Sequence, residues 1–338
     1  MATPCRRYLR AKARTLWQPQ LACCDLFAPV GSEARDFIVE QFGAHSPRLR
    51  DYASRAFDEQ WIDAEPRAGK RDGAYCASLR GDESRILANV KAAYSGMNTL
   101  AHELGHGYHN LCKAGRTPTQ RVTPMALAET ASIFCETLVR EAALAHSAPA
   151  EQLAILEASL QSACQVTVDV TSRFLFEQSL FEGHAQRELA VDELNELMLD
   201  AQRQTYGDGL DGTQLHPYMW AVKGHYYSTG RSYYNYPYMF GLLFGLGLYA
   251  RYRQDPERFT ARYDDLLAAT GLADAATLAQ RFGVDIRDAA FWRASWIRCG
   301  RILRALRAWW TRDDSGGRTS PEPIRIKLRA PAIGKGDW

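Results

Sequence analysis

The sequence has few of the features that mark secreted or membrane-spanning proteins. Its eight cysteines include no Cys-x-x-Cys pair, which is typical of reduced thiols in a cytosolic protein. The longest apolar run, Met239 to Ala250, is too short to cross a bilayer. The N-terminus has no apolar signal segment. We therefore expect a cytoplasmic protein without stable membrane insertion.

The distribution of charge does not favour a nucleic-acid-binding protein. Residues 1–30 carry a net charge of +4 and residues 293–338 carry +7, so with +2 for the whole chain the body between them carries −9. An acidic body argues against a nucleic-acid groove, and no module with interleaved aromatic and basic residues is present. We expect no nucleic-acid partner. The sequence does not predict an oligomeric state.

Strand signals are also scarce, because they are confined to about residues 74–91. The apolar run at 85–91 is either a buried strand or an edge that pairs with an extended peptide. The 206–238 segment, rich in Gly, Tyr and Pro, predicts loops. Helical spacing covers most of the remaining chain, which predicts a mainly α fold with a small β element. The ranges expected to be helical are 32–60, 93–112, 125–147, 149–190, 192–205, 238–254, 256–269 and 274–293.

The most informative motif follows this β element at His102-Glu103-Leu104-Gly105-His106. On an α-helix, residues four apart share a face, so both imidazoles can reach one cation. Glu103 lies next to the first imidazole and can act as the general base on a water bound to zinc. This spacing predicts a catalytic zinc site.

A third ligand is expected downstream, because catalytic zinc usually takes three protein ligands. Glu129 follows a predicted turn at Pro124 and has apolar neighbours, which favours a buried carboxylate over a solvated one. Glu136 lies seven residues later on the same helical face. It is placed to accept a hydrogen bond from a ligand imidazole. The alternative, that both glutamates are solvated, is less favoured.

A second cluster of polar aromatic residues lies far along the chain. Residues 225–238 contain one histidine and six tyrosines in the sequence HYYSTGRSYYNYPY. Tyrosines often lie half-buried at the edge of a core, which is the structural interpretation. Phenols and imidazoles can also donate hydrogen bonds to an oxyanion that forms during catalysis, which is the functional interpretation.

The segments TLAHELGHGYHN and PMALAETASIFCE resemble the oligoendopeptidase F and thimet oligopeptidase family of zinc metallopeptidases. The resemblance implies a zincin-like catalytic fold with one Zn²⁺ ion per chain. It implies that His102, His106 and Glu129 bind the metal and that Glu103 is the catalytic base. His109 is present in the family without being a ligand, so we expect it to pack or to hydrogen-bond behind the site.

The same resemblance assigns roles in the tyrosine-rich segment. It makes His225 and Tyr236 the candidates for transition-state stabilisation, and it implies that Tyr233 and Tyr234 contact the substrate. A shift of one residue in this alignment is possible, so the individual tyrosines stay interchangeable at this point.

The resemblance also sets the expected organisation. It implies a catalytic domain over residues 1–295, with the N-terminal helical domain of the family largely missing. The arginine-rich start could be a transit peptide, but it also matches a family helix, which is the favoured interpretation. Residues 296–338 are expected to be an atypical basic tail with little order. Ile297 through Trp310 could form a basic amphipathic helix for an anionic membrane surface. A shifted reading frame or a degenerate gene end would also give such a tail and is the favoured explanation.

Together these features predict a zinc-dependent metalloendopeptidase that hydrolyses internal peptide bonds of short oligopeptides. Short peptides are the expected partners, because the family's narrow channel admits only flexible chains. The main alternative is a truncated, non-catalytic remnant that retains the zinc site. A zinc exopeptidase is a weaker option, since nothing in the sequence indicates a pocket for a terminal charge.

Overall fold

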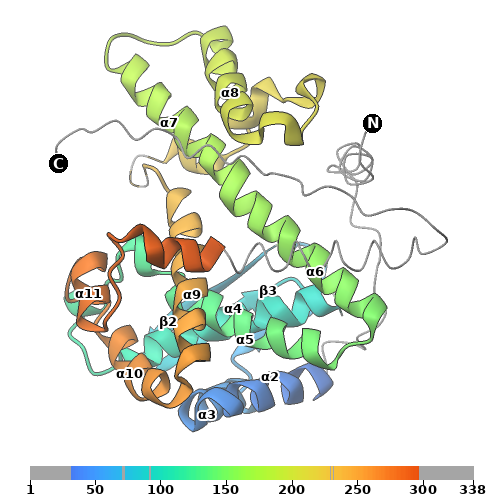
Figure 1. Ribbon diagram of the computed structural model, residues 1–338, viewed down its shortest axis with the longest axis vertical. Coiled ribbons are helices and arrows are strands. Elements are labelled where there is room, and N and C mark those ends of the chain that lie inside the picture. Colours follow the sequence, from blue (N-terminus) through green and yellow to red (C-terminus); the bar gives the residue numbers. More distant parts are fainter. Residues whose placement is uncertain (1–31, 71–72, 91–92, 229, 231, 297–338) are drawn as a thin grey trace.

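The computed structural model describes residues 32–70, 73–90, 93–228, 230 and 232–296. Most of these residues are helical, and a small three-stranded sheet precedes the central helices (Figure 1). The predicted mainly α fold with a β element is therefore confirmed. The tail expected over 296–338 and the N-terminal residues 1–31 lie, apart from residue 296, outside the described residues.

The first predicted helix is two helices. Helices α2 (Ser32–His45) and α3 (Pro47–Asp58) meet at Ser46. Pro47 has no N–H to donate and begins α3, where that loss costs least. Ser46 caps α3 by accepting a hydrogen bond from the Leu49 N–H. The apolar spacing over 32–60 predicted helix correctly but did not reveal this break.

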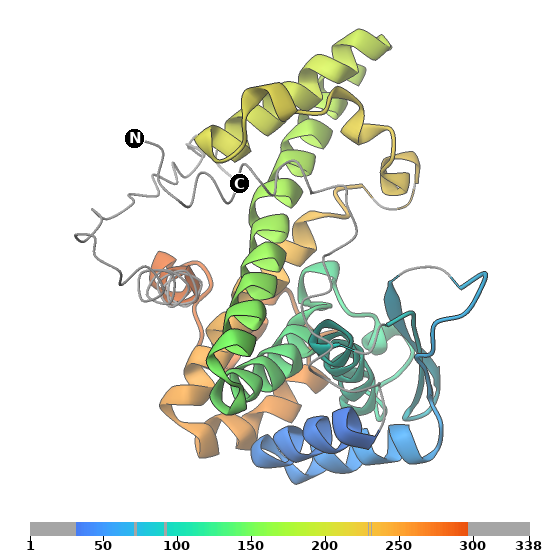
Figure 2. The same cartoon turned by 90° about the vertical axis from the view of Figure 1, so that its right-hand side faces the viewer.

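The sheet contains β1 (Ile62–Asp63), β2 (Ala74–Arg80) and β3 (Glu83–Ala88) in the order β1-β3-β2. β3 pairs in parallel with β1 and antiparallel with β2, with Cys76 opposite Ile86. Of the two interpretations of the run at 85–91, the structure does not show the free edge, because β3 is paired with β1 at Ile86 and Leu87 and with β2 on its other side. Every second residue of β3 is buried, so the strand covers one side of the next helix (Figure 2).

Two central helices form the middle of the fold. α4 (Tyr94–Cys112) carries the His102–His106 motif, and α5 (Thr130–His146) returns beside it. The predicted helix from residue 125 begins later, because Met125–Leu127 forms a separate 3₁₀ turn after Pro124. This turn makes Glu129 the residue that precedes α5.

A long helical segment rises from these central helices. α6 (Pro149–Cys164) continues through a π-helical turn at Gln165–Asp169 into α7 (Val170–His184), and α8 (Val191–Tyr206) packs against α7 (Figures 1 and 2). These two last helices have their own small apolar cluster around Phe176 and Met198. Single π-helical turns often occur near functional sites.

The remaining helices close the core. α9 (Tyr236–Gln254) packs along α5, and α10 (Pro256–Ala268) contacts α4. α11 (Ala275–Arg281) is shorter than predicted, because the chain turns at Gly283, whose φ of 77° is in the left-handed region, before a further helical stretch at 289–296. The loops predicted over 206–238 contain four short 3₁₀ turns and end where α9 begins at Tyr236. Within the described part of the chain, no helix is long and apolar enough to cross a membrane.

Candidate metal centre

His102 and His106 lie on one face of α4, one helical turn apart. Their ring centroids are 4.9 Å apart, and both Nε2 atoms face the same carboxylate oxygen. The distance to Glu129 Oε2 is 3.2 Å from His102 Nε2 and 3.3 Å from His106 Nε2. The structure therefore brings together the three residues that the sequence singled out as metal ligands.

Two glycines permit the close packing that positions Glu129. A Cβ added at Gly105 of α4 would lie 2.7 Å from Ala131 O, so α5 can approach α4 this closely only because a hydrogen occupies that position. On the opposite side, a Cβ at Gly241 of α9 would lie 2.4 Å from Glu129 Cβ. The absence of a side chain at Gly105 and at Gly241 therefore lets α4 and α9 pack closely against the start of α5, where Glu129 lies.

A hydroxyl orients the Glu129 carboxylate. Ser132 Oγ lies one turn into α5 and donates to Glu129 Oε2 at 2.8 Å. This is the same oxygen that faces the two imidazoles. Because a carboxylate oxygen has two lone pairs, Glu129 Oε2 can accept this hydrogen bond and still face the two histidines. No sequence pattern had singled out Ser132.

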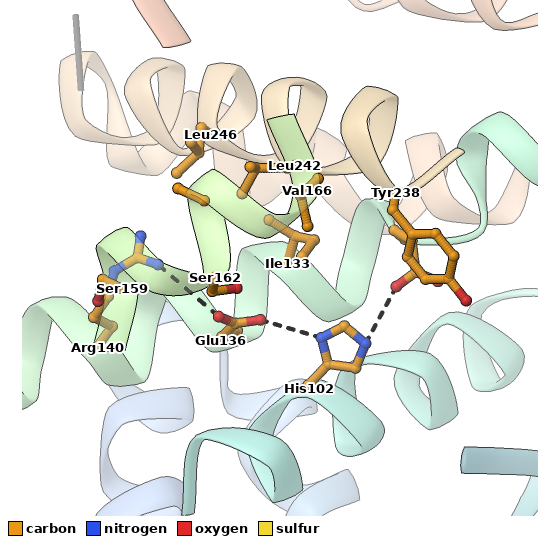
Figure 3. Close-up of a pocket in the computed structure, with 12 residues that line it drawn as sticks. His102, Ile133, Glu136, Arg140, Ser159, Ser162, Val166, Tyr238, Leu242 and Leu246 are labelled. Carbon is orange, nitrogen blue, oxygen red and sulfur yellow. Dashed lines mark hydrogen bonds and ion pairs between the residues drawn. The ribbon is translucent and has the colours of Figure 1, made fainter. Parts of the chain in front are cut away.

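Glu136 holds the far side of His102. Its Oε2 lies 3.2 Å from His102 Nδ1, and its Oε1 lies 4.0 Å from the Arg140 guanidinium (Figure 3). A carboxylate on Nδ1 fixes the tautomer that leaves Nε2 free for a metal and increases the basicity of that nitrogen. This geometry matches the part predicted for Glu136.

Hydrogen bonds within this cluster favour the charged forms of His102, Glu129 and Glu136. Burial by itself would lower the pKa of His102, but hydrogen bonds with Glu129 and Glu136 raise this pKa to about 10. Burial would likewise raise the pKa of Glu129, yet its hydrogen bonds with the two imidazoles hold that pKa well below its usual range. The pKa of Glu136 is lowered for the same reason, against the effect of burial.

Glu103 is buried beside the histidines, with 5% of its surface exposed. Its Oε2 has no hydrogen-bond partner among the described residues. Burial raises the pKa of this carboxyl, and the neighbouring imidazoles of His102 and His106 oppose that rise. A desolvated carboxylate with an unused oxygen is suited to accept a proton from a molecule that enters the site.

The donor set fits a zinc ion. One ligand atom from each of His102, His106 and Glu129 lies within 4.8 Å of the other two. Two imidazoles and one carboxylate form a ligand set found in catalytic zinc sites, where a fourth position is left for water or substrate. The unpartnered oxygen of Glu103 adds a buried polar atom that an occupant of this fourth position would satisfy.

Tyr238, which the sequence analysis did not single out, borders the candidate metal ligands. Together with His102 and Glu129, Tyr238 lines a cavity (Figure 3), which Tyr236 does not line. Burial raises the pKa of Tyr238, and its hydrogen bond with Tyr234 and the nearby Glu129 carboxylate add to that rise. Tyr236 begins α9 and is 39% exposed. The close spacing of these tyrosines made the choice ambiguous from sequence.

His225 lies in a separate polar network that reaches α7. Asn235 is buried, its Nδ2 lies 2.5 Å from His225 Nε2, and its Oδ1 accepts from Arg173 at 3.4 Å. Arginine only donates, so Asn235 must turn its oxygen toward Arg173 and its amide hydrogens toward His225. His225 Nε2 is therefore an acceptor, and the ring proton is on Nδ1. Burial, with the nearby cations Arg173 and Lys223, lowers the pKa of His225.

The two other predicted tyrosines lie between these networks. Tyr234 OH accepts from Tyr238 OH at 3.4 Å, and its ring is 6.1 Å from the His225 ring. Tyr233 has a φ of 56°, unusual for a residue with a side chain, and its N–H donates to Glu177 on α7 at 2.6 Å. Strained backbone of this kind often occurs at functional sites. Contact of either tyrosine with substrate stays a prediction.

His109 is buried behind the site rather than in it. Its Nε2 lies 2.8 Å from the Oγ1 of Thr270, two residues after the end of α10, and burial lowers its pKa well below the usual value. A neutral histidine that bridges α4 to the closing helices agrees with the packing role expected for it.

A known protein family matches most of this chain, including the residues of the candidate metal centre. The model of peptidase family M3 matches residues 41–296. The chain belongs to this family. The match includes both histidines of α4 and the glutamates at the start of α5 and within it, so the resemblance inferred from sequence is confirmed. Within family M3, the chain is of the oligoendopeptidase F type.

Relatives of known sequence agree with this assignment. The M3 chain is 33% identical over 233 residues to the chromosomal oligoendopeptidase F of Lactococcus lactis, covering 65% of this chain and 38% of that protein. It is 27% identical over 302 residues to the plasmid-encoded oligoendopeptidase F of the same organism, covering 84% of this chain and 50% of that protein. The chain therefore spans about half the length, or less, of these relatives.

Solved structures share the fold. The superposition on a protein from Chlamydophila abortus gives a TM-score of 0.68 at 21% identity, covering 82% of this chain and 47% of that one. The superposition on the oligoendopeptidase F of Enterococcus faecium gives a TM-score of 0.58 at 18% identity, covering 91% of this chain and 50% of that one. These likenesses establish the mainly helical catalytic fold of the family.

Proposed function

We propose that this chain is a zinc-dependent metalloendopeptidase that hydrolyses internal bonds of short oligopeptides. The convergence of His102, His106 and Glu129 on one point, beside the buried Glu103 carboxylate, carries the proposal. Membership of family M3 and the similarity to oligoendopeptidase F support peptides as the substrate class. We further propose that the chain acts in the cytoplasm, in keeping with its cysteine pattern.

Each residue of the cluster has a distinct task in this proposal. His102, His106 and Glu129 hold one zinc ion per chain. When bound, zinc polarises the peptide carbonyl and makes water at its open position more acidic. Glu103 takes a proton from the attacking water and then delivers it to the departing amine. Glu136 keeps His102 oriented throughout.

Donors from the tyrosine-rich segment complete the chemistry. A peptide carbonyl that is attacked by water develops negative charge, which neutral donors stabilise. Tyr238 borders the metal ligands, and His225 presents its Nδ1 proton. Tyr236 stays a candidate for the same task, and Tyr233 and Tyr234 are the proposed substrate contacts.

Zinc analysis with a cleavage assay tests this proposal. The full chain should bind about one zinc ion and cleave an internally quenched oligopeptide. A chelator should abolish cleavage, and added zinc should restore it. The alternative is a zinc-binding chain that cleaves nothing. Bound zinc without cleavage of any peptide in a varied set would favour that alternative, and a chain that binds no zinc would contradict both.

A further inference from the structure

Helix α7 carries a buried carboxylate that is not part of the metal cluster. Glu177 is 2% exposed. Its Oε1 accepts a hydrogen bond from the backbone N–H of Tyr233 at 2.6 Å, and its Oε2 has no hydrogen-bond partner among the described residues. Burying a carboxylate without a cation beside it costs free energy, and such groups often occur at functional sites. The contact with Tyr233 is therefore the feature to explain.

Tyr233 has a backbone conformation that needs support from its surroundings. Its φ of 56° lies in the left-handed region, which residues with a side chain rarely adopt. The ring packs on the same helix as the carboxylate, with its centroid 5.3 Å from the ring of Phe174 and 5.5 Å from the ring of Phe181. A strained residue persists where several contacts fix it, and here all of these contacts come from α7.

The two residues that follow Tyr233 lead to the proposed oxyanion donors. Tyr234 is hydrogen-bonded to Tyr238, which borders the metal ligands. Asn235 is buried and is hydrogen-bonded to Nε2 of His225. A rotation of the backbone at Tyr233 would displace both residues, because they are the next two in the chain. The conformation of this turn therefore determines where the donors lie.

We propose that Glu177 is a positioning residue for the proposed hydrolysis: its carboxylate holds the strained turn at Tyr233 and thereby places the tyrosine-rich segment against the metal centre. Within the described part of the chain, Glu177 makes no hydrogen bond or ion pair with His102, His106 or Glu129. It acts through the backbone of residue 233 and does not touch the reacting atoms. This inference rests on the proposed peptidase function.

Steady-state kinetics of matched variants test this role. Glu177→Ala should leave zinc content unchanged and lower kcat by at least about tenfold, because a misplacement of about 1 Å in an active site can cost about 100-fold. Glu177→Gln should retain most of kcat, because an amide oxygen can still accept the N–H. Glu182→Ala, which removes an exposed carboxylate from the same helix, should behave like the unsubstituted chain. An undiminished kcat in Glu177→Ala would overturn the proposal.

A glycine at residue 233 separates this role from a general loss of packing. Glycine adopts a positive φ without strain, so the turn depends less on the carboxylate. Tyr233→Gly should lower activity by itself, because it removes a ring that packs on α7. Glu177→Ala should then reduce kcat by a much smaller factor in Tyr233→Gly than in the unsubstituted chain. The same factor in both backgrounds would show that Glu177 only stabilises α7, which contradicts the proposal.

Nitrogen NMR of His225 reports on the segment without requiring cleavage. In Glu177→Ala the hydrogen bond from Asn235 should weaken, so the Nε2 resonance should shift, whereas Glu182→Ala should leave it in place. A fall in kcat without this shift would contradict the proposal. If no peptide is cleaved but the resonance shifts in Glu177→Ala alone, the positioning of the segment stands and the proposed hydrolysis is wrong. If peptides are cleaved and neither kcat nor the resonance changes, the peptidase stands and the positioning is wrong.

Discussion

Ser132 donates its hydroxyl proton to Glu129 Oε2 at 2.8 Å, the oxygen that also faces both imidazoles of α4. This bond makes Ser132 a positioning residue for the third metal ligand. Ser132→Ala should weaken zinc binding by about 10–100-fold, the usual cost of losing a group that orients a ligand. Competition with a fluorescent zinc chelator measures this, and Ser132→Thr should restore most of the affinity. Unchanged affinity in Ser132→Ala would show that helix packing alone positions Glu129.

The contact between α4 and α5 at Gly105 makes a second prediction. Gly105→Ala would place a Cβ 2.7 Å from backbone atoms of Ala131 and Ser132. The helices must then separate, at a cost of about 1–3 kcal/mol in the free energy of unfolding, and zinc affinity should fall. Gly115→Ala, where a Cβ meets nothing within 4 Å, is the control. Urea denaturation of both variants checks this, and equal stabilities would contradict the close approach of the two helices.

These two residues also show where the sequence was informative and where it was not. The spacing of His102 and His106 predicted a shared helical face, since that depends only on local geometry. Glu129 was found through its apolar neighbours and the family resemblance. Gly241 and Tyr238 matter because α5 and α9 lie side by side, and a relationship between distant segments leaves no local pattern. Ser132 bonds to Glu129, only three residues away, but no motif marked that contact. Pro47 is a signal for the helix break at Ser46, but the apolar spacing continues across it and therefore favoured one unbroken helix.

The hydrogen-bond network around His225 predicts a single tautomer. With Asn235 donating to Nε2, nitrogen NMR of labelled protein should show the proton on Nδ1 near neutral pH. Asn235→Asp replaces the donor with a carboxylate, so the proton should move to Nε2 and the pKa of His225 should rise by about one unit or more. Asn195→Asp, on α8 and outside this network, should leave the tautomer and the pKa of His225 unchanged. A proton on Nε2 in the unsubstituted chain would refute the network.

His45 predicts a specific dependence of stability on pH. Its ring is packed among Phe134, Tyr252 and Tyr263, and burial lowers its pKa to about 4. In the unfolded chain this histidine binds a proton near pH 6.5, whereas in the folded chain it stays neutral to about pH 4. Stability is therefore lost as pH falls through this window, by about 3 kcal/mol.

The variant His45→Gln tests this linkage, because glutamine can still hydrogen-bond Thr260 but does not titrate. The free energy of unfolding of both proteins is compared at about pH 7 and about pH 4.5, on either side of most of the titration. From about pH 7 to about pH 4.5, the free energy of unfolding should decrease less in the variant than in the unsubstituted chain. Above about pH 6.5, the difference in free energy of unfolding between the two proteins should no longer depend on pH. Parallel curves across the whole range would show that His45 is accessible to protons in the folded state.

The central claim is that Glu103 acts as the base in a site whose ligands are other residues. The most direct measurement compares the unsubstituted chain with Glu103→Gln for zinc content and for cleavage of an internally quenched oligopeptide. We expect equal zinc content in the two proteins and a cleavage rate that falls by at least about 100-fold in Glu103→Gln, the contribution of a positioned general base. Cleavage at an undiminished rate by Glu103→Gln would contradict it.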